Sequence, residues 1–267
     1  MGTQIRRGFY DVLHGRRPIF EIEYPCHSAF EKRWYLLTLS RCLLDDVRYV
    51  LVAHKDITPV KSQSLALENV LFQTIDAIGN TIEKKDPYTS GHQRRTALLS
   101  GRIAIELALS DRTILGVWLG ALIHDLGKIY VPAELLSRPG RLSRVELELM
   151  REHPAVGYDI VRHIEFPWPV AECVRQHHER LDGSGYPNGL SGEAILQEAR
   201  IVAVADVFEA MTSHRPYRPA LPKERAVAEL SEGRGKLYDP TVVDACLAIV
   251  SDPEFDIGHL RPPGDYG

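Results

Sequence analysis

The sequence predicts a mainly α protein, in which a helical bundle follows a small antiparallel β-sheet and a connecting helix. Residues 19–58 are rich in β-branched and aromatic side chains with partial alternation, which is typical of strands. Residues 61–85 carry an apolar stripe at helical spacing, and from residue 89 onward one apolar helical pattern follows another. These observations predict three parts: a β segment over 1–60, the connecting helix, and a helical domain over 86–255.

Size and composition are those of an ordinary globular protein. The chain has 267 residues, 44% hydrophobic and 25% charged, which is enough to bury a sizeable core. A net charge of −4 and scattered basic residues argue against binding of a nucleic acid polymer. The four cysteines form no CxxC pair, as expected of free thiols in a reducing cytoplasm. No signal peptide and no apolar run of membrane-spanning length is visible, so we expect a cytoplasmic protein.

Three strands are predicted in the β segment, in "IFEIEYPC", "RWYLLTLSRCL" and "RYVLVAHKDIT", with a hairpin connection at "LDD". A sheet this small needs cover from elsewhere in the protein. The three stretches resemble the C-terminal half of a PAS domain, whose last strand ends in Asp-Ile-Thr before a helix, as at Asp56, Ile57 and Thr58. Because the PAS ligand pocket needs the other half of that domain, the resemblance implies no cofactor in this segment.

The connecting helix is predicted from apolar residues at spacings of 4, 4, 3 and 4, namely Leu67, Leu71, Ile75, Ile78 and Ile82. Such a stripe either pairs with the same helix of a second protomer, giving a homodimer, or packs on its own domain. Both alternatives stay open. Asp86-Pro87 then interrupts the pattern.

The helical domain contains one segment that is apolar all round, "TILGVWLGALIHDLGK", which predicts a central buried helix with Gly127 at its C-cap. Ser143 and Glu146 predict a capping box for a later helix, and "FPWP" ends the helix that follows. Further helices are predicted in "PVAECVRQHHE", "EAILQEARIVAVADVFEAMTS", "ERAVAELSEG" and "PTVVDACLAIV".

Polar residues stand inside these apolar segments, where a carboxylate without a partner is costly to bury. Taken singly, a buried histidine is more often a hydrogen-bonded core residue, and a buried aspartate is more often a cap. Here, however, His124, Asp125 and Asp206 lie within apolar helices, and four histidines come from three further segments. Together they are seven nitrogen and oxygen donors of the kind that divalent metals accept, without any cysteine. They are His92, His124, Asp125, His153, His177, His178 and Asp206. The set predicts a metal cluster, in which two ions sharing a carboxylate would use every member.

Residues 80–250 resemble an HD-GYP domain, a branch of the HD phosphohydrolase superfamily. The resemblance is carried by "DPYTSGHQRRT", "HDLGK", "VPAELLSRPGRLS", "HPAVG", "HHERLDGSGYP", "ARIVAVADVFEAMTSHRPYR" and "YDP", in that order. It implies a helical bundle of the HD-domain type. It also implies a metal-dependent phosphodiesterase that hydrolyses cyclic di-GMP to pGpG, GMP or both in bacterial second-messenger signalling. The alternatives are a catalytically weak cyclic di-GMP receptor and a hydrolase of another phosphodiester.

The resemblance divides the seven residues between two divalent ions. It implies His92, His124 and Asp206 on one ion, His153, His177 and His178 on the other, and Asp125 as the bridge. Iron or manganese is expected first, with zinc, cobalt or nickel as alternatives. Some members carry a glutamate for a third ion where this chain has Tyr88, so we expect two ions.

Further roles follow from the same resemblance. Lys128 and Asp125 are expected to act in catalysis, with Lys128 donating to a phosphate oxygen or to the leaving group. Arg215 and Arg218 are expected to contact the second phosphate and the guanine of the substrate. The loop at 182–187, whose glycines permit backbone angles that other residues resist, is expected to support the site and to recruit diguanylate cyclase domains.

Overall fold

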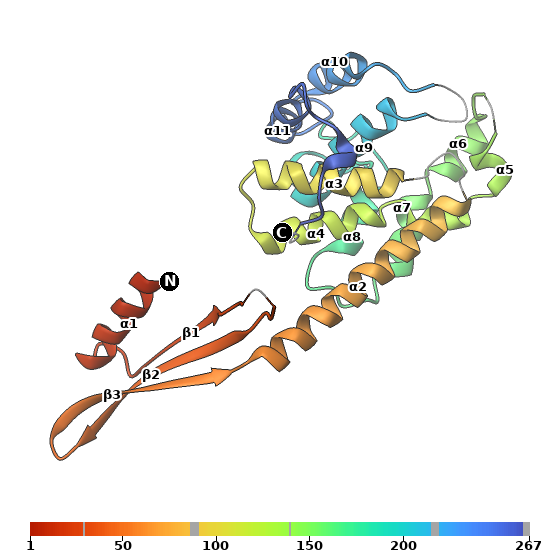
Figure 1. Ribbon diagram of the computed structural model, residues 1–267. Coiled ribbons are helices and arrows are strands. Elements are labelled where there is room, and N and C mark those ends of the chain that lie inside the picture. The colour runs from red at the N-terminus through yellow and green to blue at the C-terminus, as the bar shows by residue number, and fades with distance from the viewer. Residues whose placement is uncertain (29, 86–90, 139, 215–218, 264–267) are drawn as a thin grey trace. The chain divides into compact units, whose positions relative to one another are not determined.

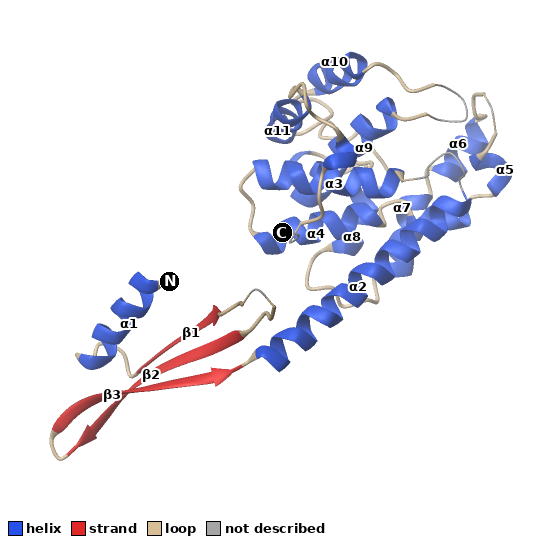
Figure 2. Cartoon of the chain, viewed as in Figure 1, coloured by secondary structure: helices blue, strands red, loops and turns tan. Residues whose placement is uncertain are grey.

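The computed structural model describes residues 1–28, 30–85, 91–138, 140–214 and 219–263. The predicted fold class is confirmed, because helices dominate and the strands form one small antiparallel sheet (Figures 1 and 2). The chain divides into two compact units, residues 1–71 and residues 72–267, which are described separately.

The first unit is a three-stranded sheet with one short helix. Strands β1 (Ile19–Pro25), β2 (Trp34–Leu44) and β3 (Val47–Asp56) pair antiparallel in the order β1-β2-β3, as the sequence predicts. Helix α1 (Gly2–Leu13) was not predicted from the sequence. It covers one face of the sheet, where Val12 is buried against Leu37 and Leu39 of β2. This helix supplies the cover that so small a sheet requires.

Helix α2 (Thr58–Lys85) contains the predicted connecting stripe. The side chain of Asp56 accepts a hydrogen bond from the main-chain N–H of Thr58 at 2.8 Å, which helps to fix where the helix begins. The division between the two units falls inside α2. Ile75 and Ile82 are both 4% exposed and belong to the core of the second unit, whereas Leu67 is 65% exposed. Ile75 and Ile82 therefore pack on their own domain, whereas Ile78 between them is 40% exposed.

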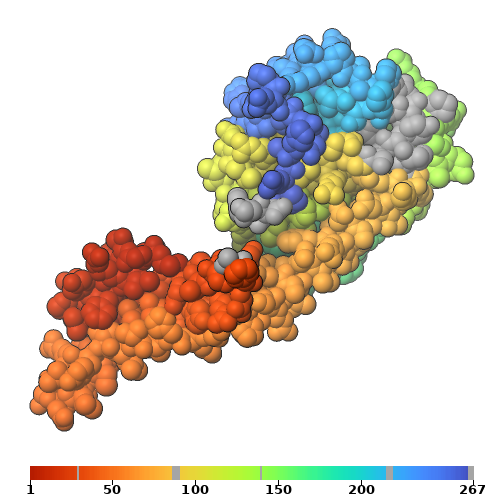
Figure 3. Space-filling view, in the orientation of Figure 1, coloured from red at the N-terminus to blue at the C-terminus, as the bar shows by residue number. Residues whose placement is uncertain are grey.

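The second unit is a helical bundle (Figure 2), and the space-filling view in Figure 3 draws one face of it. Its longer helices are α3 (His92–Glu106), α4 (Asp111–Leu122), α7 (His153–Val161), α8 (Val170–Gln176), α9 (Gln197–Thr212), α10 (Lys223–Gly233) and α11 (Pro240–Val250). Shorter pieces are η1 (Leu126–Tyr130), α5 (Ala133–Leu136), α6 (Arg144–Met150), η2 (Gly192–Ala194) and η3 (Ile257–His259). The core lies where α3, α4 and α9 meet, and Leu99, Leu119 and Ile201 are fully buried there. The predicted capping box of Ser143 and Glu146 is present at the start of α6.

The boundaries of three bundle helices differ from the sequence prediction, and one of them is α8, which ends at Gln176 and not at Glu179. The apolar helix α4 ends at Leu122, and the next residues form a turn that leads into the 3-10 helix η1. Gly127 is therefore no C-cap, and its role is close packing: an added Cβ would lie 1.8 Å from the carbonyl oxygen of His153 in α7. Helix α9 begins at Gln197, because the residues before it form η2.

In the parts of the chain that the structure describes, no helix combines the length and apolar character needed to cross a membrane. The four cysteines are free thiols.

Candidate metal centre

The side chains of the seven residues predicted as metal ligands lie together in the second unit. Six of them lie at or just beyond the ends of helices, and one lies inside a helix. His92 begins α3, His153 begins α7, His124 and Asp125 lie in the turn after α4, His177 and His178 follow α8, and Asp206 lies within α9. All are buried except His178, which is half-buried. The structure thus gathers donors from five segments, as the sequence analysis expected.

Asp125 lies at the centre of this cluster. Its Oδ1 is 3.3 Å from Nε2 of His153, and its Oδ2 is 3.5 Å from Nε2 of His124 and 3.7 Å from Nε2 of His92. Asp206 faces the same two histidines as Oδ2 of Asp125 does. Its Oδ1 is 3.2 Å from Nε2 of His92 and 3.7 Å from Nε2 of His124. The two oxygens of Asp125 therefore face two different groups of imidazoles.

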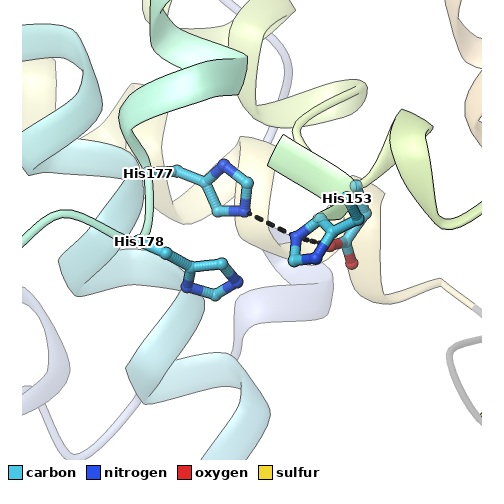
Figure 4. Close-up of side chains that lie close together, drawn as sticks. His153, His177 and His178 are labelled. Carbon is cyan, nitrogen blue, oxygen red and sulfur yellow. Dashed lines mark hydrogen bonds and ion pairs between the residues drawn. The ribbon is translucent and has the colours of Figure 1, made fainter. Parts of the chain in front are cut away.

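The second group consists of His153, His177 and His178. The Nε2 atoms of His153 and His177 are 3.3 Å apart, and the ring centroids of His177 and His178 are 4.1 Å apart. Figure 4 shows the rings of the two neighbouring histidines extending toward the same space, with His153 opposite His177. Each of the three rings offers a ligand atom that lies within 4.8 Å of the others and of an Asp125 oxygen.

Main-chain contacts fix which nitrogen of three rings points into the cluster. Nδ1 of each lies 2.7–2.8 Å from the carbonyl oxygen three residues earlier: Ala121 for His124, Met150 for His153 and Val174 for His177. A carbonyl oxygen only accepts, so Nδ1 donates its hydrogen. In a neutral imidazole the Nε2 atom then carries the lone pair.

The cluster consequently has many acceptors and few protons. Among the described residues, His124 Nε2 is buried without a hydrogen-bond partner. With both rings neutral, the Nε2 lone pairs of His153 and His177 face each other at 3.3 Å. Buried acceptors this close repel one another unless a positive charge lies between them. Imidazole nitrogens and carboxylate oxygens suit divalent transition metals, so the residues present fit metal ions.

The two aspartates are ionised in this setting. Burial acts to raise the pKa of Asp125, but Lys128, His124 and His153 outweigh it and hold that pKa well below the usual range. Lys128 is the largest single cause of the lowering, because its Nζ lies 2.6 Å from Asp125 Oδ2. Burial opposes ionisation of Asp206 in the same way, and His124 and His92 lower its pKa well below the usual range.

Two of the histidines are neutral. Burial, with the neighbouring histidines, lowers the pKa of His177 and of His178 well below the usual value. Neutral imidazole is the form that binds a metal ion. With two carboxylates and neutral imidazoles as ligands, a pair of divalent cations would leave the cluster with net positive charge.

The profile of the HD domain matches residues 76–242, which is more than half of the chain. The chain belongs to the HD-domain family. HD phosphohydrolases are metal-dependent, in keeping with the His/Asp clusters described above. The match lies in the helical unit, and the PAS resemblance of residues 19–58 stays a prediction.

Relatives of this HD domain have phosphodiesterase names. The chain is 41% identical over 201 residues to the cyclic di-GMP phosphodiesterase response regulator RpfG of Xanthomonas campestris, covering 70% of this chain and 53% of the relative. It is 36% identical over 183 residues to the 3'3'-cGAMP-specific phosphodiesterase 3 of Vibrio cholerae, covering 68% of this chain and 40% of the relative. The chain thus spans about half the length of such relatives or less.

The fold is shared with Bd1817, an HDG"Y"P protein from Bdellovibrio bacteriovorus. The TM-score is 0.53 over 87% of this chain and 100% of that protein, at 15% sequence identity. This likeness concerns the fold alone.

The loop after His178 holds its position in the HD domain through a buried carboxylate. Glu179, 2% exposed, accepts hydrogen bonds from the main-chain N–H groups of Asn188 and Leu190 at 2.8 and 3.0 Å. Gly183 has φ of 78°, as the turn prediction expected. Gly185 serves close packing, since an added Cβ would lie 2.4 Å from the Cα of Glu179. The loop is thereby fastened to the chain that carries the two histidines.

Two buried glutamates near His92 were missed by the sequence analysis. Glu209, 1% exposed, contacts Nδ1 of His92 and also accepts hydrogen bonds from Arg95 and Ser213 at 2.7 and 2.6 Å. Burial acts to raise the pKa of Glu209, but these partners lower it to about 2. Its sequence signal was available: it follows Asp206 by three residues on an otherwise apolar helix, so the two share a face.

The second missed glutamate is Glu83, near the end of α2. Its carboxylate accepts hydrogen bonds from the main-chain N–H groups of Gly91 and Gln93 at 2.6 and 3.0 Å. These groups lie on either side of His92, so Glu83 holds the start of α3 in place.

Five residues named in the sequence analysis lie outside the described residues. They are Asp86, Pro87, Tyr88, Arg215 and Arg218. The predicted substrate contacts of the two arginines therefore stay predictions.

Proposed function

We propose that the protein is a metal-dependent phosphodiesterase that hydrolyses cyclic di-GMP to pGpG, GMP or both in bacterial second-messenger signalling. The observation that carries the proposal is the placement of Asp125, whose two carboxylate oxygens face separate groups of imidazoles. The 41% identity to a protein named as a cyclic di-GMP phosphodiesterase supports the choice of substrate.

We infer that the cluster binds two divalent metal ions. His92, His124 and Asp206 would hold one ion, His153, His177 and His178 the other, and Asp125 both. The division is supported by the first group, in which the Nε2 atoms of His92 and His124 lie 3.2–3.7 Å from carboxylate oxygens of Asp206 and Asp125. Iron or manganese is the expected metal, with zinc, cobalt or nickel as alternatives, because the donors are nitrogen and oxygen without thiolate.

The mechanism assigns separate tasks to the ions and to the chain. When bound, the ions supply activation of a water molecule and positive charge for the phosphate oxygens. The carbonyl groups of Ala121, Met150 and Val174 keep three Nε2 atoms directed inward, which preorganises the site.

Lys128 is the residue placed to act on the substrate. Its side chain is 16% exposed, and its Nζ lies 2.6 Å from Asp125 Oδ2. From there it donates a hydrogen bond to a phosphate oxygen or gives a proton to the leaving alkoxide. Asp125 holds the ammonium group in place before the substrate binds. Arg215 and Arg218 would contact the second phosphate and the guanine.

Another cyclic dinucleotide is the second candidate substrate, since a relative at 36% identity is named for 3'3'-cGAMP. A receptor with little turnover is not favoured, because all seven donors are present and gathered. We also propose that the protein forms a homodimer through α2, which the exposed N-terminal part of the α2 stripe, including Leu67, supports. The 182–187 loop would bind diguanylate cyclase domains, and the protein would be cytoplasmic.

The proposal is tested by assaying the full chain, loaded with manganese or ferrous iron, against three cyclic dinucleotides. Cyclic di-GMP, 3'3'-cGAMP and cyclic di-AMP are incubated separately, and products are separated by chromatography. We expect turnover of cyclic di-GMP, with His124→Ala and Asp125→Ala abolishing it. Lys128→Ala should lower kcat about 10²- to 10⁴-fold, the range for a lost general acid.

Exposed residues give matched controls. His163→Ala and Asp159→Ala remove the same residue types at positions away from the cluster and should retain wild-type rates. Binding of cyclic di-GMP without turnover would support the receptor alternative. Hydrolysis that survives both His124→Ala and Asp125→Ala would contradict the proposed site.

A further inference from the structure

His92 is held differently from the other histidines of the cluster whose Nδ1 contacts are known. His124, His153 and His177 each donate Nδ1–H to a neutral main-chain carbonyl. His92 instead directs Nδ1 at Oε2 of Glu209, a carboxylate from a helix 117 residues further along the chain. A carboxylate partner increases the electron-donating power of the imidazole toward a metal at Nε2 more than a carbonyl does.

Glu209 has little freedom to do anything else. Its Oε1 accepts from Arg95 Nε and Nη2 at 2.7 and 2.6 Å and from Ser213 Oγ at 2.6 Å. With Oε1 occupied, Oε2 stays directed at His92. Because an ionised carboxylate only accepts, this contact places the imidazole hydrogen on Nδ1 and leaves the Nε2 lone pair facing Asp206 and Asp125.

The geometry also links the positioning group to a neighbouring donor. Asp206 and Glu209 are three residues apart on α9 and so share one face of that helix. Asp206 faces Nε2 of His92 at 3.2 Å, while Glu209 contacts Nδ1 of the same ring. One face of α9 thus supplies a candidate ligand, Asp206, and also Glu209, which orients a second ligand, His92, and increases its electron-donating power.

The two halves of the cluster therefore differ in charge. Two carboxylates act on the half around His92, Asp206 directly and Glu209 through the ring, in addition to the shared Asp125. The other half has three imidazoles and Asp125. We propose that Glu209 is a positioning residue that makes the His92 half bind its metal ion more tightly than the His153 half, so that the two ions enter in a fixed order. This inference rests on the proposed two-metal site.

The test is metal titration of the full chain after removal of metal with a chelator. Manganese is added in the presence of a competing chelator, and the two dissociation constants are read by calorimetry. The wild type should bind two ions with unequal constants. Glu209→Gln should weaken the tighter site by about 10- to 100-fold, the usual effect of losing such a partner, and leave the weaker site within about threefold.

Double variants identify which half is affected. In His153→Ala the tight site remains, and adding Glu209→Gln should weaken it by the same factor as in the wild type. In His92→Ala that half is already lost, so adding Glu209→Gln should change nothing. Glu198→Gln, on the same helix but away from the cluster, is the matched control and should leave both constants unchanged.

The outcomes separate this inference from the proposed function. A wild type that binds no ion would overturn the two-metal site itself. A wild type that binds two ions, with Glu209→Gln leaving both constants unchanged or altering only the weaker one, would overturn the role of Glu209 alone. Circular dichroism checks folding. If Glu209→Gln does not fold, Ser213→Ala, which removes one hydrogen bond to Oε1, replaces it and should weaken the tight site to a smaller extent. No change in that variant would also overturn the inference.

Discussion

Replacing Gly127 by alanine is a direct test of how the cluster is built. An alanine Cβ at this position would lie 1.8 Å from the carbonyl oxygen of His153 and 2.6 Å from the main-chain nitrogen of Gly157. Both obstacles are backbone atoms of α7, so no side-chain rotation relieves them. Ordinary contact needs about 3.4 Å, and η1 and α7 must therefore separate by about 1.5 Å.

This separation acts on stability and on the site together. Overpacking of a rigid contact costs about 1–3 kcal/mol of unfolding free energy, and occasionally more. His153 begins α7, so the same movement lengthens the 3.3 Å distance between its Nε2 and Asp125 Oδ1. A misplacement of about 1 Å in a catalytic site can lower the rate about 100-fold. Gly127→Ala should therefore lose both stability and phosphodiesterase activity.

Urea unfolding and initial rates with cyclic di-GMP measure the two effects. Gly157→Ala is a milder comparison, since its Cβ would lie 2.8 Å from the side chain of Val174 and 3.1 Å from the main-chain nitrogen of Gly127, both longer than the 1.8 Å contact at Gly127. Gly2→Ala, with open space around it, should be close to neutral. If Gly127→Ala matched the wild type in unfolding free energy and in rate, close packing of η1 on α7 would not be what brings His153 to Asp125.

Three further predictions concern protons, helix positioning and metal. In the metal-free protein, the lowered pKa values of His177 and His178 mean that only the unfolded chain takes up these protons below pH about 6.5. The unfolding free energy should thus fall with falling pH, by up to about 2.7 kcal/mol per pH unit, measured by urea titrations. Glu83→Gln weakens charge-assisted hydrogen bonds beside His92 and should cost about 1–2 kcal/mol of unfolding free energy in urea. Manganese at 100 times the dissociation constant of the tighter site should stabilise the wild type by at least about 2.7 kcal/mol, raising Tm, and should lose most of this effect in Asp125→Ala.

Each of these predictions has its own control. The change of unfolding free energy with pH should become smaller in the double variant His177→Ala, His178→Ala, and an unchanged pH dependence would show that other groups produce it. Glu106→Gln, at the exposed other end of α3, should be neutral, and an equal loss there would count against Glu83. Equal stabilisation of Asp125→Ala by manganese would place metal binding elsewhere.

The sequence by itself determined which residues were available and which elements carried them. Strands alternate and helices repeat every 3.6 residues, so β1 to β3 and most helices of the bundle could be predicted from local spacing. His124, Asp125 and Asp206 stood out because polar residues in apolar helices require a compensating partner, and four further histidines completed the set of donors. Helix α1 was missed because little of its surface reaches the core: Val12 is buried, but Tyr10 is 52% exposed.

Only the tertiary structure decided how those residues meet. The end of α4 at Leu122 contradicts its apolar pattern, because close packing of Gly127 on α7 sets the path of the chain and local periodicity does not. The contact of His92 with Glu209 joins residues 117 positions apart, and no local spacing encodes such a pairing. Contacts of this kind depend on how whole helices pack against one another. They decide which nitrogen of each ring faces the cluster, and thus what the gathered side chains can bind.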